Sequence, residues 1–94
     1  MEVKVGMADL NVCSAPDSII TMGLGSWVGV VLWDRNTRIC GMVHVMLPDS
    51  TLISQNSNKA KFADTGIDEL IRLVTAKGAK REHLVAKIAG GAQM

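Results

Sequence analysis

The chain has no excess of charge of either sign, because ten Lys and Arg balance nine Asp and Glu for a net charge of +1. This balance gives no electrostatic basis for binding nucleic acid or an anionic membrane. Long apolar runs are also missing, since no stretch approaches the ~18 residues of a membrane span. The first residues, Met1-Glu-Val-Lys4, begin acidic and alternate, unlike a signal peptide. The sequence therefore predicts a cytoplasmic protein that does not insert into membranes.

Cysteine is scarce as well: the chain has only Cys13 and Cys40, whose spacing fits no metal-binding motif. In a cytoplasmic protein we expect two reduced, half-buried thiols. The glycines Gly23, Gly25 and Gly29 do not have the spacing of a dinucleotide-binding loop, and apolar, β-branched residues follow them where such a loop needs a helix. We therefore expect neither a metal nor an organic cofactor.

The residues that are present predict one small globular domain, with 48% hydrophobic and 20% charged residues over a length of 94. Alternating or continuous apolar segments indicate strands at 2–8, 18–22, 27–32, 38–47 and 84–88. Between them, 11–17 and 49–58 have the composition of loops. The six methionines lie among apolar positions, where we expect them to pack in the core.

One helix is predicted between the fourth and fifth strands, over 59–77. Its apolar residues recur at steps of three and four, and they are Ala63, Ile67, Leu70, Ile71 and Val74. Asn58 is the expected N-cap, Gly78 ends the helix, and Asp68 and Arg72 form an expected ion pair.

The predicted order is therefore β-β-β-β-α-β, an α+β fold in which one helix packs on a mixed, largely antiparallel sheet. A single helix cannot cover both faces of the apolar strand 27–32. We expect further chain or a partner on the second face.

A tight turn at Asp34 to Thr37 places two side chains of possible chemical interest together. If these two turn residues face each other, an antiparallel ladder sets Trp27 directly opposite His44. A slip of one residue would send the two side chains to opposite faces of the sheet. The proximity of Trp27 and His44 is therefore a conditional prediction.

Two interpretations of His44 remain open. It is either a buried structural imidazole or a general acid and base beside the glycine corner that ends at position 27. Thr21 is either an ordinary strand residue or the group that orients the imidazole. The backbone N–H groups of the corner, at Gly25 and Ser26, could hold an oxyanion.

Four motifs in this order are specific enough to indicate a family. They are Thr21-x-Gly23-Leu-Gly25-Ser26-x-Val28, His44-Val-Met-Leu-Pro-Asp49-Ser50, Phe62-Ala-Asp64-Thr65-Gly-Ile-Asp-Glu-Leu70 and Lys87-Ile-Ala-Gly90-Gly91-Ala92. Over residues 4–94 the chain resembles the CheD family of chemoreceptor glutamine deamidases.

The resemblance implies hydrolysis of glutamine side-chain amides on methyl-accepting chemoreceptors, at a Cys-His-Thr site like that of toxin deamidases. His44 would be the general base and Thr21 the orienting residue. The family's nucleophilic cysteine belongs at the position of Trp27, so the resemblance predicts an inactive enzyme. Val28 and Leu47 are expected to contact the substrate or partner.

Family members continue beyond the Gly-Gly-Ala motif, so 1–94 is expected to be a single CheD-like domain that is truncated at its C-terminus. They are also similar in docking a CheC-type chemotaxis phosphatase. A non-catalytic module that binds this phosphatase or the receptor is therefore the alternative function. A purely structural fragment is a third possibility.

Overall fold

The structure, a computed structural model, describes residues 1–25, 27–45 and 63–91. These residues form six strands, one α-helix and one short 3-10 helix. The strands are β1 (Glu2–Val5), β2 (Leu10–Ser14), β3 (Ser18–Thr21), β4 (Val28–Asp34), β5 (Ile39–Val45) and β6 (Leu84–Gly90). The helix α1 is Ala63–Lys77, and the 3-10 helix η3 is Arg81–His83. No helix in these ranges is long and apolar enough to cross a membrane.

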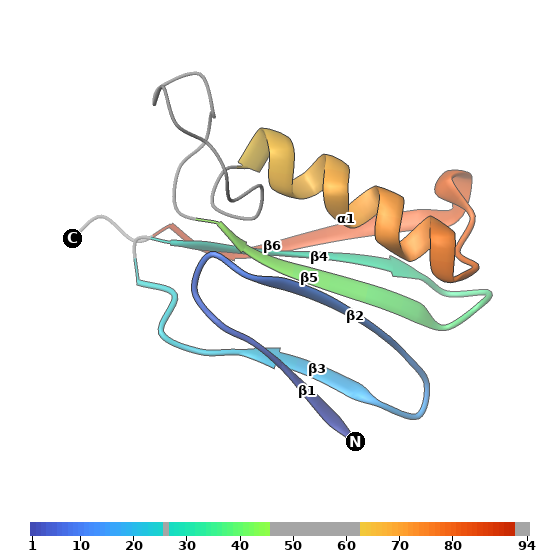
Figure 1. The fold of residues 1–94 in the computed structure, drawn as a ribbon, viewed down its shortest axis with the longest axis horizontal. Helices are drawn as coiled ribbons and strands as arrows, with labels where there is room; N and C mark the ends of the chain where they lie inside the picture. The colour runs from blue at the N-terminus through green and yellow to red at the C-terminus, as the bar shows by residue number, and fades with distance from the viewer. Residues whose placement is uncertain (26, 46–62, 92–94) are drawn as a thin grey trace.

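The elements form three layers (Figure 1). The central layer is an antiparallel sheet of four strands in the order β2-β5-β4-β6. Helix α1 covers one face of this sheet, mainly over β5 and β2. The parallel pair β1 and β3 lies on the other face. The predicted combination of one helix with antiparallel strands is therefore confirmed.

The prediction of a single mixed sheet is wrong, because β1 and β3 form a two-stranded sheet of their own. This pair covers part of the face that the helix leaves open, so the missing layer comes partly from the chain itself. The predicted loop 11–17 also contains an additional strand, β2, which pairs along β5. Its five residues lie between turn-forming segments, and pairing with β5 is what holds them extended.

The helix ends at Lys77 as predicted, and Gly78 follows with a φ of +128°. A left-handed backbone at this position favours glycine. The expected start of the helix at 59–62, its cap Asn58 and the loop 49–58 lie outside the described residues. The predicted pair of Asp68 and Arg72 is wrong, because the Arg72 guanidinium instead binds Glu69, one turn earlier.

The core lies between the helix and the central sheet. Leu70 and Val74 of α1 are fully buried against β4 and β5, together with Val43. The expected packing of the methionines holds only in part, since Met42 is buried but Met7 and Met22 are 65% and 72% exposed.

The turn between β4 and β5 is longer than predicted, and this changes the register. Four residues, 35–38, connect the strands, and Arg38 takes a φ of +59°. Asp34 consequently pairs with Ile39 rather than Thr37. The ladder is therefore shifted by two residues from the predicted one. A shift of two preserves the face on which each side chain lies.

The carboxylate of Asp34 stabilises this longer turn from a fully buried position. It accepts hydrogen bonds from the backbone N–H groups of Lys80 at 2.8 Å, Asn36 at 2.9 Å and Thr37 at 3.3 Å. These hydrogen bonds hold the pKa of Asp34 below its ordinary value. The bond from the Lys80 N–H has the largest effect, followed by those from Thr37 and Asn36. One buried carboxylate thus ties the β4–β5 turn to the segment that precedes β6.

Gly41 of β5 marks the closest approach of the helix to the sheet. A Cβ at this position would lie 2.6 Å from Leu70 Cδ1 and 2.8 Å from Val74 Cγ1. We expect Gly41→Ala to lower the free energy of unfolding by about 1–3 kcal/mol through overpacking, measured by denaturant titration. Gly6→Ala is the matched control, because its Cβ would meet no atom within 4 Å. Equal midpoints for the two variants would contradict this packing.

Candidate functional site

His44 lies near the end of β5 on the face that the β1–β3 pair covers, and it is fully buried. Its backbone is held at the start of β2: the His44 N–H donates to Asp9 O, and the Ala8 N–H donates to His44 O, both at 3.0 Å. On the other side it pairs with Gly29 of β4. The backbone of His44 is therefore fixed between β4 and the segment before β2, and its partner on β4 has no side chain.

Thr21, the last residue of β3, binds the imidazole directly. Its Oγ1 lies 2.9 Å from His44 Nδ1 and 2.6 Å from the carbonyl oxygen of Val5. The hydroxyl donates its one hydrogen to Val5 O, so its oxygen accepts from Nδ1–H. We therefore assign the neutral imidazole as the tautomer protonated at Nδ1. The lone pair is then on Nε2.

Nε2 of His44 is buried and has no hydrogen-bond partner. An unpaired buried ring nitrogen is a costly feature in a purely structural histidine. Burial without a counter-charge lowers the pKa of His44 below that of an ordinary histidine. The side chain is therefore a neutral base with its accepting atom unused.

Trp27 meets this imidazole, although not at the predicted pairing position. His44 is opposite Gly29, and Trp27 lies two residues before Gly29, which makes it a diagonal neighbour. The two rings are 5.2 Å apart between centroids at an angle of 82°, an edge-to-face contact. A Cβ on Gly29 would lie 3.3 Å from Leu24 Cδ2 and 3.7 Å from the Thr21 methyl group, so these two side chains fill the space that Gly29 leaves. The indole has no group that attacks a carbonyl.

The other predicted site residues are only partly brought to this place. Gly25 lies in the corner with a φ of +50°. The N–H of Trp27 donates to Leu24 O, so it is not available to an oxyanion. Val28 lies on the opposite face of β4, where it packs against the core. Ser26 and Leu47 lie outside the described residues.

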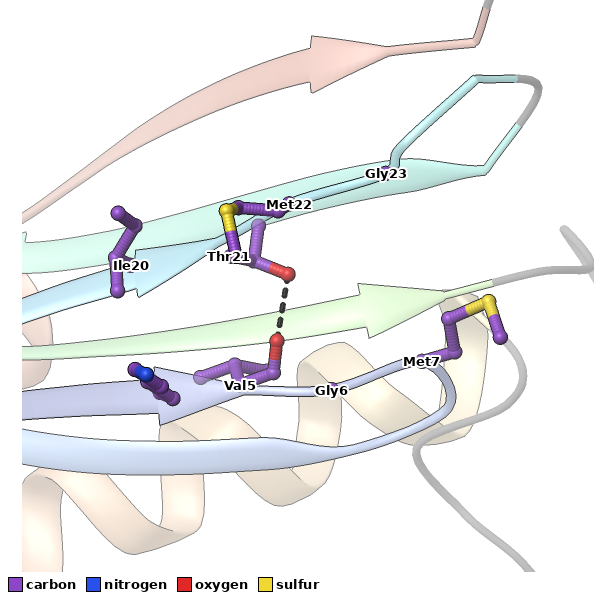
Figure 2. A pocket seen from close by; sticks show the side chains of 8 residues that line it. Val5, Gly6, Met7, Ile20, Thr21, Met22 and Gly23 are labelled. Atoms are coloured by element: carbon purple, nitrogen blue, oxygen red, sulfur yellow. Dashed lines mark hydrogen bonds between the residues drawn. The ribbon is translucent and has the colours of Figure 1, made fainter.

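Two hollows adjoin Thr21. A groove of about 350 Å³ lies at the ends of β1 and β3, where Met7 and Met22 project around the Thr21–Val5 hydrogen bond (Figure 2). A second hollow of about 250 Å³ extends along the sheet past Gly29 toward Lys87. Both are mainly apolar, and they offer space for side chains that flank a reacting group.

The two cysteines are separate from this site. They pair directly across β2 and β5 as free thiols, with their Sγ atoms 3.3 Å apart. Cys13 is buried and Cys40 is half-buried. Burial, and then the neighbouring thiol, raises the pKa of Cys40 to about 12. A thiol with so high a pKa is a poor nucleophile.

Sequence reasoning missed two components of the site. The Val5 carbonyl fixes the direction of the Thr21 hydroxyl, and Gly29 makes room for the Leu24 side chain and the Thr21 methyl group. A backbone acceptor leaves no trace in the sequence, because every residue has one. Gly29 did have a signal: it is a glycine within an apolar strand, which often marks a close approach.

The buried imidazole generates a prediction about pH. Because its folded pKa is lowered, the unfolded state binds more protons near the ordinary histidine pKa. We expect the free energy of unfolding to decrease as the pH falls below about 6.5. Denaturant titration at several pH values measures this, and His44→Gln should remove the slope. An NMR titration of His44 with a midpoint at or above 6.5 would contradict it, with His83→Gln identifying the other histidine signal.

Comparison with known proteins agrees with these residues. Residues 46–94 match the family described as CheD chemotactic sensory transduction. The chain is 68% identical over 92 residues to the probable chemoreceptor glutamine deamidase CheD of Lachnoclostridium phytofermentans, covering 98% of this chain and 57% of that protein. It is 59% identical over 93 residues to the chemoreceptor glutamine deamidase CheD of Halalkalibacterium halodurans, with 98% and 57% coverage. The chain thus spans little more than half the length of these relatives, and it belongs to the CheD family.

Proposed function

We propose that this chain derives from a protein-glutamine deamidase, an amidohydrolase that acts on methyl-accepting chemoreceptors in the cytoplasm, and that Trp27 makes it inactive. The observation that carries this proposal is the bond from His44 Nδ1 to Thr21, which leaves a buried Nε2 without a partner beside position 27. The names of the relatives support the substrate class, since they are chemoreceptor glutamine deamidases. The layered fold would be that of the Cys-His-Thr toxin deamidases.

The proposed chemistry needs a thiol at position 27. His44 Nε2 would take the proton of the thiol, and the thiolate would attack the carbon of the glutamine amide. N–H groups of the corner at Gly25 and Ser26 would stabilise the oxyanion. The imidazolium would then protonate the amide nitrogen, and the C–N bond would break to release ammonia. Water would finally hydrolyse the thioester to give glutamate and restore the thiol.

Thr21 and the Val5 carbonyl have a defined part in this scheme. Together they hold the neutral imidazole in the tautomer whose Nε2 can accept a proton. Trp27 removes the covalent step, because indole carbon and nitrogen are not nucleophiles toward an amide. The ring also fills the space against the imidazole where the reacting groups would meet.

Restoring the thiol tests the proposal. We expect Trp27→Cys to release ammonia from a chemoreceptor peptide that contains glutamine, and the unaltered chain to release none. Trp27→Ser is the matched control, because it removes the indole without supplying a thiol. Adding His44→Ala to Trp27→Cys should lower the rate about 10²–10⁴-fold, the usual contribution of a general acid and base.

The rate of Trp27→Cys should rise and then fall with pH, because the attacking state needs both a thiolate and an imidazolium. A profile that stays flat across the titration range of histidine would exclude this role of His44. A folded Trp27→Cys protein without activity would overturn the assignment of position 27.

A second candidate function is a non-catalytic module that binds a CheC-type phosphatase or the receptor. The exposed Met7 and Met22, which line the groove at the ends of β1 and β3, and the half-buried Trp27 favour this candidate. Tryptophan is enriched among the residues that dominate binding energy, and methionine adapts to irregular surfaces. Loss of the nucleophile would leave this surface intact.

Binding measurements separate the two functions. If the chain is a binding module, it should capture a CheC-type phosphatase, and Met22→Ala should weaken the complex about tenfold or more. Ile88→Ala is the matched control, because Ile88 is 73% exposed but lies on β6. Absence of binding by the folded chain would eliminate the module, and equal losses for the two variants would place the contact elsewhere.

A further inference from the structure

The motif Gly90-Gly91, where β6 ends, has no role in the chemistry above, yet it contacts the backbone of residue 27 directly. The Gly91 N–H donates a hydrogen bond of 2.9 Å to the carbonyl oxygen of Trp27. A Cβ on Gly90 would lie 2.3 Å from that same oxygen and 3.2 Å from Leu24 Cβ. Only a hydrogen atom fits between Gly90 and residue 27.

The backbone conformation of the motif adds a second requirement for glycine. Gly90 and Gly91 have φ values of +98° and +74°, which side chains of L-residues rarely adopt. This turn lets the chain pair Gly90 with Val28 and then direct the next N–H at the Trp27 carbonyl. Glycine is therefore required here for two independent reasons, the backbone conformation where β6 ends and the lack of space beside residue 27.

The peptide groups of residue 27 are consequently held from two sides. Its N–H donates to Leu24 O across the glycine corner, at 2.6 Å. Its carbonyl accepts from the N–H of Gly91, the residue that follows β6. With both groups engaged, the Cα–Cβ direction at position 27 is determined by the backbone rather than by the side chain there. The same direction would apply to any residue at this position.

We propose that Gly90 and Gly91 are positioning residues: they hold the backbone of residue 27 so that its side chain meets the imidazole of His44. In this chain the consequence is the ring contact of Trp27 with His44. In a form with cysteine at position 27, the consequence is the placement of the nucleophile against its base. This catalytic part rests on the deamidase function proposed above, whereas the geometric part does not.

Gly90→Ala tests the geometric part in the unaltered Trp27 chain. The added methyl should displace the Trp27 carbonyl, separate the two rings and admit water to His44. We expect loss of the cross-ring nuclear Overhauser effects and a rise of the His44 pKa toward 6.5, the ordinary value. Gly78→Ala is the matched control, because it has a left-handed φ of +128° but lies at the end of α1 and contacts Ile39.

The catalytic part is tested in the Trp27→Cys background. Gly90→Ala should lower kcat roughly a hundredfold, the effect of a misplacement of about 1 Å, with little change in KM. Gly78→Ala should leave kcat unchanged. If Trp27→Cys itself is inactive, the deamidase proposal fails, and the NMR measurements on the Trp27 chain still decide the positioning role.

A measurement on the unaltered chain covers the case in which Gly90→Ala does not fold. The Gly91 amide should be strongly protected from hydrogen exchange, because it donates to the Trp27 carbonyl. A rapidly exchanging Gly91 amide in the folded protein would overturn the proposal. So would a folded Gly90→Ala protein with unchanged ring contacts and His44 pKa, or the same changes in Gly78→Ala.

Discussion

The hydrogen bond between Thr21 and His44 joins the two sheets of this protein and determines the chemistry of its site. Thr21 belongs to the β1–β3 pair, and His44 belongs to the central sheet. The bond is directional because the Val5 carbonyl uses the only hydrogen of the hydroxyl. One interaction thus holds two layers together, selects the tautomer and leaves Nε2 unpaired.

The Thr21–His44 bond requires that the N-terminal part of the chain cover the second face of the central sheet. An imidazole on an open face would be solvated, and its pKa would not be lowered by burial. The β1–β3 pair excludes water from His44 while leaving an apolar groove at the ends of its strands. The same two short strands therefore bury the imidazole and form the groove close to it. The imidazole is thereby buried, with a lowered pKa, close to an apolar groove.

Position 27 shows how the backbone, rather than the side chain, can place a group against the imidazole of His44. The Trp27 N–H donates to Leu24 O and its carbonyl accepts from the Gly91 N–H, and neither bond depends on its side chain. The indole therefore occupies a place that the backbone defines. Its edge-to-face contact with His44 is favourable in its own right. The fold around the imidazole thus accommodates a large aromatic ring at position 27.

Much of the candidate site could be predicted because strand geometry conserves the face of each side chain. The predicted register was wrong by two residues, yet Trp27 and His44 remained on one face, because side chains in a strand alternate with a period of two. The error arose at the turn, where Asp34 binds the N–H of Lys80, a residue 46 positions away. The length of that turn therefore depended on a partner that local sequence does not reveal. Val28 shows the opposite case. It follows Trp27 directly in the sequence, but because side chains alternate along a strand, its side chain packs against the core.

The sequence by itself determined the apolar periodicities, the helix and its end at Gly78, and the motifs that carry the family likeness, because these depend on residues close together in the chain. Tertiary structure alone decided that β1 and β3 leave the central sheet, that β2 is a strand, and that Gly90 approaches residue 27. Each of these depends on contacts between segments far apart in sequence, whose free energies are absent from any local pattern.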